Sequence, residues 1–448
     1  MGSGGSRGRI GVTRIKIVKN ILHIDMNSYF ATVEQQANPR LRGKPIGVTG
    51  GDRMQRTVIG AASIEAKRFG VKTGMPPWEA LKLCPEIIFV NGDSDKYLET
   101  TKRFLNILKD YTPYVEVFSI DECFLEIKPS LRGPKARGNP LRLKDCFVVN
   151  TPRNDVVKIA LDIKRRIRSE IGEWISCSIG ISYNKLMAKL AGSLIKPDGL
   201  VVIANPEEAI KILNHIELDE ICGIGRQIKK RLNNSGIFNF KQLRVVPLPA
   251  LLASYKSYGQ TLYNMARGLD YSEIIPFYER EEVKSIGHRH TLECDTSDVE
   301  HIKQVLLKLC ELVARRLRAK NLVGKTVSCW YRNALNGNVH FTGDGMQVTI
   351  LSTRDGLEIF QAAWKSFHQI FSGGKIRMIG VSISNLRPQN PETISLLPEN
   401  KRQETIIAAL DKINDKFGEF TLQRGILLDS TNIKRRPNPF LSDRRFKL

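Results

Sequence analysis

The sequence predicts an α+β protein with three or four domains. At 448 residues the chain is too long for one hydrophobic core. Up to residue 181, hydrophobic patterns in the order strand, helix, paired strands, helix and strand are typical of a split βαβ sheet. A similar set of strands and helices returns between residues 283 and 386, after a small, mostly helical region at 204–275.

Apolar runs and helix-ending residues define the first set of elements. Asn38-Pro39 ends one helix, Gly70 ends another, and Ser94 is expected to cap a long helix that runs to Lys109. A short helix is predicted to start at the segment 74–77. In chain order, we expect strands at 21–25, 45–49, around Asp121 and Glu122, and at 175–181, with helices at 28–36, 64–69, 94–109 and 156–171.

The second set is predicted to form a small four-stranded sheet backed by two helices. Apolar side chains recur at helical spacing from Ile302 to Leu317, which indicates a buried helix face rather than a site. The other face of the sheet would be free to lie on a partner. We expect strands at 283–292, 325–332, 338–351 and 376–386, with helices at 298–320 and 355–371.

Several segments have little potential to form a core. Residues 1–6 are typical of a flexible tail, and residues 128–153 form a loop rich in proline, glycine and arginine. Near the C-terminus we expect a short helix over 408–418, ended by a glycine, and then a loose basic segment over 434–448.

The charge of the chain indicates a polyanionic partner. There are 69 Lys and Arg against 46 Asp and Glu, a net +23, and nucleic acid fits this excess better than a membrane surface. No run of about 18 apolar residues is present, so we expect no membrane span. The 8 cysteines contain no CxxC pair, which favours reduced thiols in a cytoplasmic protein over disulfides or zinc.

Three carboxylates stand at points where strand-forming segments end or are interrupted. Asp25 ends an apolar run, and the adjacent Asp121 and Glu122 interrupt another. Buried carboxylates are costly unless a cation pairs with them, and oxygen ligands suit hard divalent ions. The pattern predicts a two-metal site for nucleotidyl transfer, to which the main-chain carbonyl of Met26 could contribute. The alternative is that Asp121 and Glu122 only form a polar turn.

Two segments closely resemble the catalytic motifs of Y-family DNA polymerases, nearest to the bacterial polymerase IV branch: His23–Glu34 (HIDMNSYFATVE) and Phe118–Leu125 (FSIDECFL). The resemblance runs from about residue 21 to 388. It implies a right-hand polymerase with a ferredoxin-like palm, small fingers, a helical thumb and a ββα-type little finger. The implied ranges are an N-terminal tail at 1–20, palm at 21–28 and 94–203 with the 128–153 insertion, fingers at 29–93, thumb at 204–276, linker at 277–284, little finger at 285–388 and a C-terminal tail at 389–448.

The resemblance implies roles for residues of the two motifs. Asp25, Asp121 and Glu122 would bind two Mg²⁺ ions and catalyse the reaction, with Mn²⁺ as an alternative ion. Phe30 matches the steric gate, an aromatic ring that packs under the incoming sugar, next to Tyr29 in the nucleotide site. Without the motif, Phe30 would be interpreted as a core residue. Asn27 stands where some members have a second acid, which is not one of the three ligands.

The fingers motif departs from the family pattern. In Ser63–Val71, Ile64 and Lys67 occupy the positions of a phosphate-binding tyrosine and arginine, and Ala61 occupies that of a nearby threonine. Lys67 keeps the charge without the bidentate fork, and Arg68 could compensate. Lys196 matches the lysine of the palm that faces the β- and γ-phosphates; without the resemblance it would be a solvated lysine before a turn.

DNA contacts are expected in two regions. The segment Ile221–Leu232 resembles a helix-hairpin-helix, whose Gly-x-Gly turn can present amides to a phosphate. The expected residues there are Gly223, Gly225, Arg226, Lys229 and Lys230, and in the little finger Arg289 and Arg332, with Arg315, Arg316, Arg318, Lys320, Lys325 and Arg377 also available. The Gly-x-Gly segment alone could also be a purely structural turn.

The expected partners are primer–template DNA and deoxynucleoside triphosphates, and the expected state is a monomer. Thr393–Leu397 resembles the peptide that docks bacterial polymerases on the sliding clamp, but with Thr393 and Leu397 in place of the usual glutamine and phenylalanine. An exposed linker strand is the alternative there. The resemblance implies a low-fidelity, template-directed polymerase for translesion synthesis. The alternatives are a nucleotidyl cyclase on a palm-like fold and a catalytically silent DNA-binding scaffold.

The missing hydroxyls at positions 61 and 64 predict weak nucleotide binding. Each lost hydrogen bond to a charged group is worth about 1.5–3 kcal/mol, so Ile64→Tyr should lower the Michaelis constant for a deoxynucleotide by about tenfold or more. Steady-state primer extension measures this constant. An unchanged value would contradict this interpretation of the departure.

Overall fold

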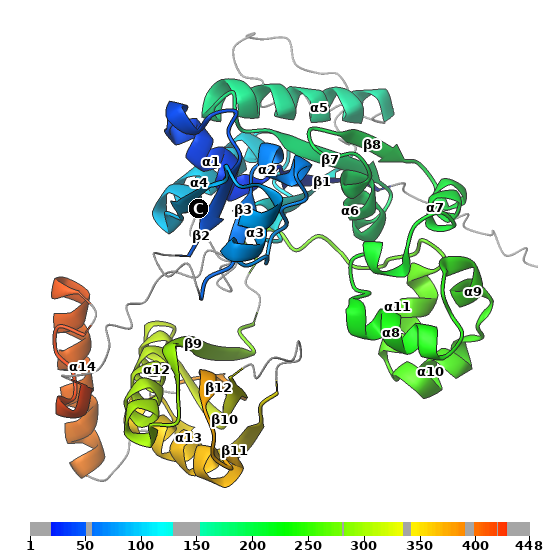
Figure 1. Cartoon of the computed structure of the whole chain (residues 1–448). Helices are drawn as coiled ribbons and strands as arrows, with labels where there is room; N and C mark the ends of the chain where they lie inside the picture. Colours follow the sequence, from blue (N-terminus) through cyan, green and yellow to red (C-terminus); the bar gives the residue numbers. More distant parts are fainter. Residues whose placement is uncertain are drawn as a thin grey trace, which may run out of the picture. The chain divides into compact units, whose positions relative to one another are not determined.

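The computed structural model describes residues 19–50, 56–128, 153–279, 282–334, 342–389, 398–418 and 420–427. The predicted N-terminal tail up to residue 18, nearly all of the 128–153 loop and the clamp-like peptide Thr393–Leu397 lie outside these ranges. The described chain falls into two units, the first ending at Glu279 and the second holding the residues from 282 onward (Figure 1).

The first unit is built on a five-stranded sheet in the order β5-β6-β1-β7-β8 (Figure 1). The central strand β1 pairs antiparallel with β6 on one side and with β7 on the other, and β7 pairs parallel with β8. Apolar side chains of β1 alternate between the two faces of the sheet. The bounds are β1 Asn20–Met26, β5 Val115–Val117, β6 Glu122–Ile127, β7 Cys177–Ser182 and β8 Leu200–Ile203.

Helices cover both faces of this sheet. Leu22 and Ile24 share one core with α1 (Tyr29–Ala37), α4 (Ser94–Lys109) and α5 (Arg153–Arg166, continued by a π-turn at Ile167–Ile171). Ile21 and Phe124 pack with α6 (Lys185–Leu194) instead. Gly180 of β7 allows α6 to approach closely, because a Cβ at this position would lie 2.1 Å from the carbonyl oxygen of Ala188.

The start of α4 differs in detail from the prediction. Asp93, rather than Ser94, is the N-cap, and its carboxylate accepts hydrogen bonds from the amides of Asp95 and Lys96. Both residue types are good caps, and the extended backbone of Asp93 decides between them.

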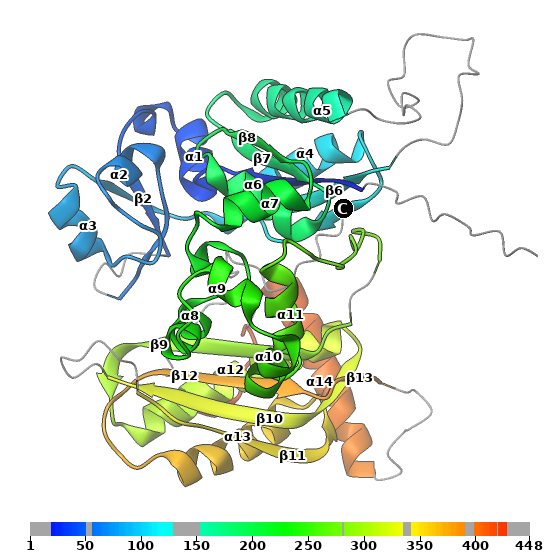
Figure 2. The same cartoon turned by 90° about the vertical axis from the view of Figure 1, so that its right-hand side faces the viewer.

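A smaller three-stranded sheet, β3-β2-β4, forms a lobe beside the five-stranded sheet together with α2 and α3 (Figure 2). The sequence predicted β2 but missed β3 and β4. Gly60, Ala61 and Ala62 of β3 are small and carry no strand pattern, so only pairing with β2 defines that strand. The bounds are η1 Pro39–Leu41, β2 Ile46–Thr49, β3 Ile59–Ala62, α2 Ile64–Arg68, α3 Pro77–Leu83 and β4 Ile88–Asn91.

A cluster of short helices ends the first unit (Figure 1). Its apolar core includes Ile221 and Ile224, which flank the turn at Gly223, and Gly223 has a positive φ of 110° that favours glycine. The bounds are α7 Pro206–Leu213, η4 Leu218–Glu220, α8 Arg226–Asn234, α9 Phe240–Val245, α10 Leu248–Tyr255 and α11 Tyr258–Met265.

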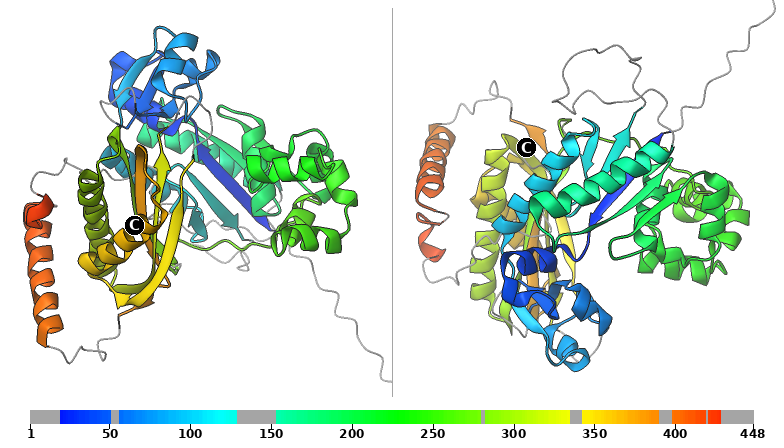
Figure 3. Two further views of the ribbon diagram at one scale, coloured as in Figure 1. Left: turned by 60° about the horizontal axis from the view of Figure 1, so that its bottom comes forward. Right: turned by 90° about the horizontal axis from the view of Figure 1, so that it is seen from above.

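The second unit contains the four predicted strands in the order β11-β10-β12-β9, with α12 and α13 on the same side of the sheet (Figure 3). The short strand β13, which the sequence did not predict, pairs with β10 as a fifth strand. The apolar stripe from Ile302 to Leu317 is buried against this sheet, as the helical spacing predicted. The bounds are β9 Ser285–Thr296, α12 Val299–Ala319, β10 Leu322–Asn333, β11 Gly345–Thr353, α13 Gly356–Ile370, β12 Ile376–Ser384 and β13 Arg387–Pro388.

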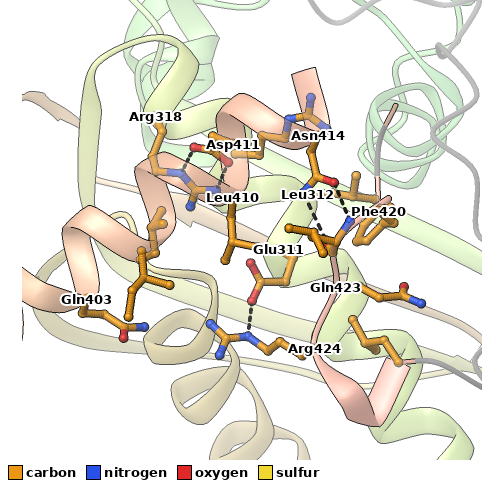
Figure 4. Close-up of a pocket in the computed structure, with 15 residues that line it drawn as sticks. Glu311, Leu312, Arg318, Gln403, Leu410, Asp411, Asn414, Phe420, Gln423 and Arg424 are labelled. Atoms are coloured by element: carbon orange, nitrogen blue, oxygen red, sulfur yellow. Dashed lines mark hydrogen bonds and ion pairs between the residues drawn. The ribbon is translucent and has the colours of Figure 1, made fainter. Parts of the chain in front are cut away.

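The C-terminal helix α14 (Pro398–Phe417) begins ten residues earlier than the sequence pattern indicated, and η5 (Gly425–Leu427) follows it. Side chains of α14 and α12 line a pocket of about 200 Å³ (Figure 4). Arg318 donates to both carboxylate oxygens of Asp411, at 2.5 and 2.7 Å, and Arg315 bonds to Asp415. Arg315 and Arg318, which were expected to be available to DNA, are thus engaged in ion pairs with α14.

The structure bears on the expected absence of a membrane span and on the expected state of the cysteines. No helix in the described part of the chain is long and apolar enough to cross a membrane. The seven cysteines that the structure describes are free thiols, and all of them are buried except Cys222 and Cys294.

The pair Arg318–Asp411 predicts how firmly α14 is held. Losing its charge-assisted hydrogen bonds in Asp411→Asn should cost about 1.5–3 kcal/mol, which raises amide hydrogen exchange in α14 about tenfold or more. Exchange measured by mass spectrometry tests this, with the exposed Lys412→Gln as the control. The exchanged-charge double variant Arg318→Asp, Asp411→Arg should recover protection, and equal exchange in all variants would contradict the prediction.

Candidate active site

Two carboxylates face each other at one end of the central strands, and a third lies in the bend beside them. Asp25 on β1 lies directly opposite Glu122, the first residue of β6, in the antiparallel register. Asp121 precedes Glu122, and its carbonyl oxygen accepts a hydrogen bond of 2.9 Å from the amide of Met26. The pairing therefore brings Asp25 and Glu122 together and leaves Asp121 next to them in the chain, although 96 positions separate residues 25 and 121.

The three carboxylates also influence each other electrostatically. Burial raises the pKa of Asp121, and the negative charges of Asp25 and Glu122 raise it further. The hydroxyl of Ser119 donates to Asp121 at 2.5 Å and partly opposes this shift. Neighbouring acids that resist ionisation are stabilised by a shared cation, so the cluster is a candidate metal site.

Glu122 is held by two donors on the same oxygen. Its Oε2 lies 2.9 Å from His23 Nε2 and 2.5 Å from Lys189 Nζ. Burial opposes the ionisation of Glu122, but the hydrogen bond from His23 and the charge of Lys189 outweigh it and lower the pKa to about 2. His23, Asp25 and Glu122 each offer one potential ligand atom, and these three atoms lie within 4.8 Å of one another.

Neither His23 nor Lys189 was expected from the sequence to contact the carboxylates. A signal for His23 was present, because residues two apart on a strand share a face and His23 stands two residues before Asp25. Lys189 lies on α6, which no motif connected with the carboxylates, so only the packing of α6 on the sheet brings it to Glu122.

Two of the expected nucleotide-binding lysines lie beside the carboxylates. Lys196 Nζ is 2.8 Å from Asp25. Burial and the positive charge of Lys196 lower the pKa of Lys67, while Asp25 and Asp121 oppose that shift, so Lys67 is close to the same cluster. Arg68 is the last residue of α2 and is exposed.

The start of α1 lies immediately after the first motif. Ser28, the N-cap, has a positive φ of 47° and makes no capping hydrogen bond with its side chain. The hydroxyl of Tyr29 is buried and bonds to the carbonyl of Tyr97 and to Thr101, so its side chain belongs to the core. The ring of Phe30 stacks on Tyr97, with centroids 4.4 Å apart and an interplanar angle of 21°.

The departures in the fingers motif leave no hydroxyl at positions 61 and 64. Ala61 is buried in β3, and Ile64 begins α2. The neighbouring Ser63 does not replace the missing groups, because its hydroxyl is buried and bonds to the backbone of Lys44, Ile46 and Ala66.

Asn27 has a structural position. Its side-chain amide donates to Ser176 Oγ and accepts from Ser178 Oγ, and only 4% of the residue is exposed. These bonds tie the start of α1 to β7.

The candidate DNA-binding residues lie in both units. Gly223, Gly225 and Arg226 form the turn and the first residue of α8, and Lys230 on that helix is exposed. Lys229 instead forms ion pairs with Glu217 and Asp219. In the second unit, Arg289 on β9 is exposed, and Arg332 on β10 lies over the ring of Trp330.

Comparison with protein families matches three parts of the chain. Residues 24–193 match the impB/mucB/samB family, residues 219–270 match a DNA polymerase-iota thumb domain, and residues 283–396 match the C-terminal domain of the impB/mucB/samB family. The first match contains all three carboxylates, and the second contains the Gly223 turn.

Curated relatives match nearly the whole chain. A protein of Pelotomaculum thermopropionicum named DNA polymerase IV is 35% identical over 424 residues, which are 93% of this chain and 97% of the relative. One of Moorella thermoacetica with the same name is 34% identical over 417 residues, 92% of this chain and 97% of the relative.

A solved structure shows the same fold. A Y-family DNA polymerase chimera aligns with a TM-score of 0.65 and 24% identity, and covers 83% of this chain and 100% of its own. Sequence motifs, family matches and fold agree, and the chain belongs to the impB/mucB/samB family of Y-family DNA polymerases, in the branch of the bacterial proteins named DNA polymerase IV.

Proposed function

We propose that the chain is a low-fidelity, template-directed DNA polymerase whose catalytic residues are Asp25, Asp121 and Glu122, and that it acts in translesion synthesis. The observation that carries this proposal is the register of β1 and β6, which sets Asp25 opposite Glu122. Family membership favours this function over a nucleotidyl cyclase or a silent scaffold.

The donor set fits two Mg²⁺ ions, with Mn²⁺ as an alternative. The donors are carboxylate oxygens of Asp25 on β1, of Asp121 in the bend before β6 and of Glu122 on β6, with the main-chain carbonyl of Met26 on β1, and all are hard ligands. When bound, such ions lower the pKa of the primer 3′-hydroxyl and neutralise charge on the pyrophosphate that leaves. The carboxylates and the Met26 carbonyl would hold the arrangement of metal ligands before the substrates arrive.

Other residues of the cluster would handle the triphosphate. Lys196 is paired with Asp25 but 41% of its side chain is exposed, so it can turn from the carboxylate to the β- and γ-phosphates. The N-terminal amides of α1, which no side chain caps, favour an anion, as do Lys67 and Arg68. Tyr29 would act through its main chain, because its hydroxyl is used in the core.

Phe30 would select deoxyribonucleotides. Its ring is backed by the stacked ring of Tyr97, whose hydroxyl donates to Glu34 at 2.8 Å. A ring supported in this way cannot easily withdraw from a 2′-hydroxyl. The sugar of a ribonucleotide would therefore clash with it.

We propose that DNA is held through its phosphates by Gly223, Gly225, Arg226 and Lys230, with weaker participation of Lys229 because of its ion pairs. Arg289 and Arg332 would contribute from the second unit. We further propose a monomer that works in the cytoplasm, and docking on a sliding clamp through Thr393–Leu397, a peptide outside the described residues.

Asp121→Asn tests the catalytic assignment. The substitution removes one charge from the metal site with little change in shape, and we expect primer extension with Mg²⁺ to fall by at least about a thousandfold. The exposed Asp95→Asn is the control and should keep its activity. Retained extension in Asp121→Asn, or turnover of ATP without a primer, would contradict the proposal.

Phe30→Ala tests the steric gate. Removing the ring should raise the incorporation of ribonucleotides relative to deoxynucleotides by at least about tenfold, since a relieved clash of 1.4 kcal/mol already gives that factor. Single-nucleotide primer extension measures the ratio of kcat/KM values. Phe238 is an exposed phenylalanine of the helical cluster, and Phe238→Ala should leave the ratio unchanged. An unchanged ratio in Phe30→Ala would contradict the assignment of Phe30 as the steric gate.

A further inference from the structure

His23 is a buried histidine beside the carboxylates. It is 1% exposed and lies on the same face of β1 as Asp25. Its Nε2 is 2.9 Å from Glu122 Oε2, and its ring lies 4.7 Å from that of Phe124. Its Nδ1 is buried and has no hydrogen-bond partner in the part of the chain that the structure describes.

A role as a metal ligand conflicts with the surroundings of Nδ1. If Nε2 bound a cation, the ring proton would sit on Nδ1, and a metal-bound histidine almost always donates that N–H to an acceptor. Here Nδ1 faces Gly192 of α6, where an added Cβ would lie only 3.1 Å away. An orphaned N–H in such a position costs about 1–3 kcal/mol.

The opposite tautomer satisfies the same surroundings. With the proton on Nε2, His23 donates to Glu122, and Nδ1 carries only a lone pair, which is cheaper to leave unpaired than a donor. Lys189, whose ammonium lies 4.4 Å from the ring centre of Phe118, already supplies a positive charge at Glu122.

We propose that His23 is a positioning residue that fixes Glu122 for metal binding. Together with Lys189 it occupies Oε2, so that Oε1, which makes no hydrogen bond within the described residues, is the oxygen presented to a cation. His23 acts through Glu122 and does not touch the metal. The inference rests on the proposed metal site at Asp25, Asp121 and Glu122.

Three substitutions of His23 distinguish the role of Nε2 from that of Nδ1. Glutamine places its amide nitrogen near the position of Nε2, asparagine places it near that of Nδ1, and leucine keeps only the apolar volume that packs on Phe124. The full chain is titrated with Mn²⁺ alone, without DNA or nucleotide. His23→Leu and His23→Asn should bind Mn²⁺ about 10- to 100-fold more weakly, as for other residues that orient a metal ligand.

His23→Gln should keep most of the affinity of the wild type. The exposed His215→Gln is the matched control and should bind like the wild type. Affinity lost equally in the glutamine and leucine variants, or unchanged in all of them, would overturn the positioning role.

A measurement on the wild type does not depend on any variant folding. Pulsed electron paramagnetic resonance of the Mn²⁺-bound protein should show no directly coordinated histidine nitrogen. A strong coupling to such a nitrogen would make His23 a ligand and overturn the inference. Failure of the wild type to bind Mn²⁺ would instead remove the metal site itself, and with it the proposed function.

Discussion

The antiparallel pairing of β1 with β6 is the constraint on which the site depends. Because side chains alternate along a strand, a slip of one residue would turn Glu122 to the opposite face from Asp25. The hydrogen bond from Met26 to the carbonyl of Asp121 fixes the end of this register. Apolar residues of β1 on both faces are buried, so any slip would also expose core side chains.

The concentration of negative charge at this end of the sheet is balanced by lysines. Asp25 pairs with Lys196, and Glu122 pairs with Lys189. The two lysines differ in freedom, since Lys189 packs over Phe118 whereas Lys196 extends from a turn after α6 and is more exposed. Paired charges of this kind lower the cost of burying carboxylates before a metal binds. The fixed Lys189 therefore suits a structural role, and the more exposed Lys196 suits contact with a substrate.

The nucleotide site keeps its backbone elements while losing side-chain donors. No side chain caps the N-terminus of α1, so the backbone N–H groups of its first turn remain available, and any residue except proline supplies such a group. The hydroxyls expected at positions 61 and 64 are absent, and Ser63 is committed to the backbone around it. Under the proposed function, phosphate binding would therefore depend on the α1 amides and on lysine charge.

The sequence alone determined the α+β class, the acidic motifs and the buried stripe of α12, because local periodicity and a short motif express these directly. The tertiary structure alone decided the features that arise from contacts between distant residues. Pairing with β2 created β3, the packing of α6 brought Lys189 to Glu122, and α14 engaged Arg315 and Arg318. Such contacts join residues about 15 to 100 positions apart, and no local pattern encodes which partner a side chain meets after the chain has folded.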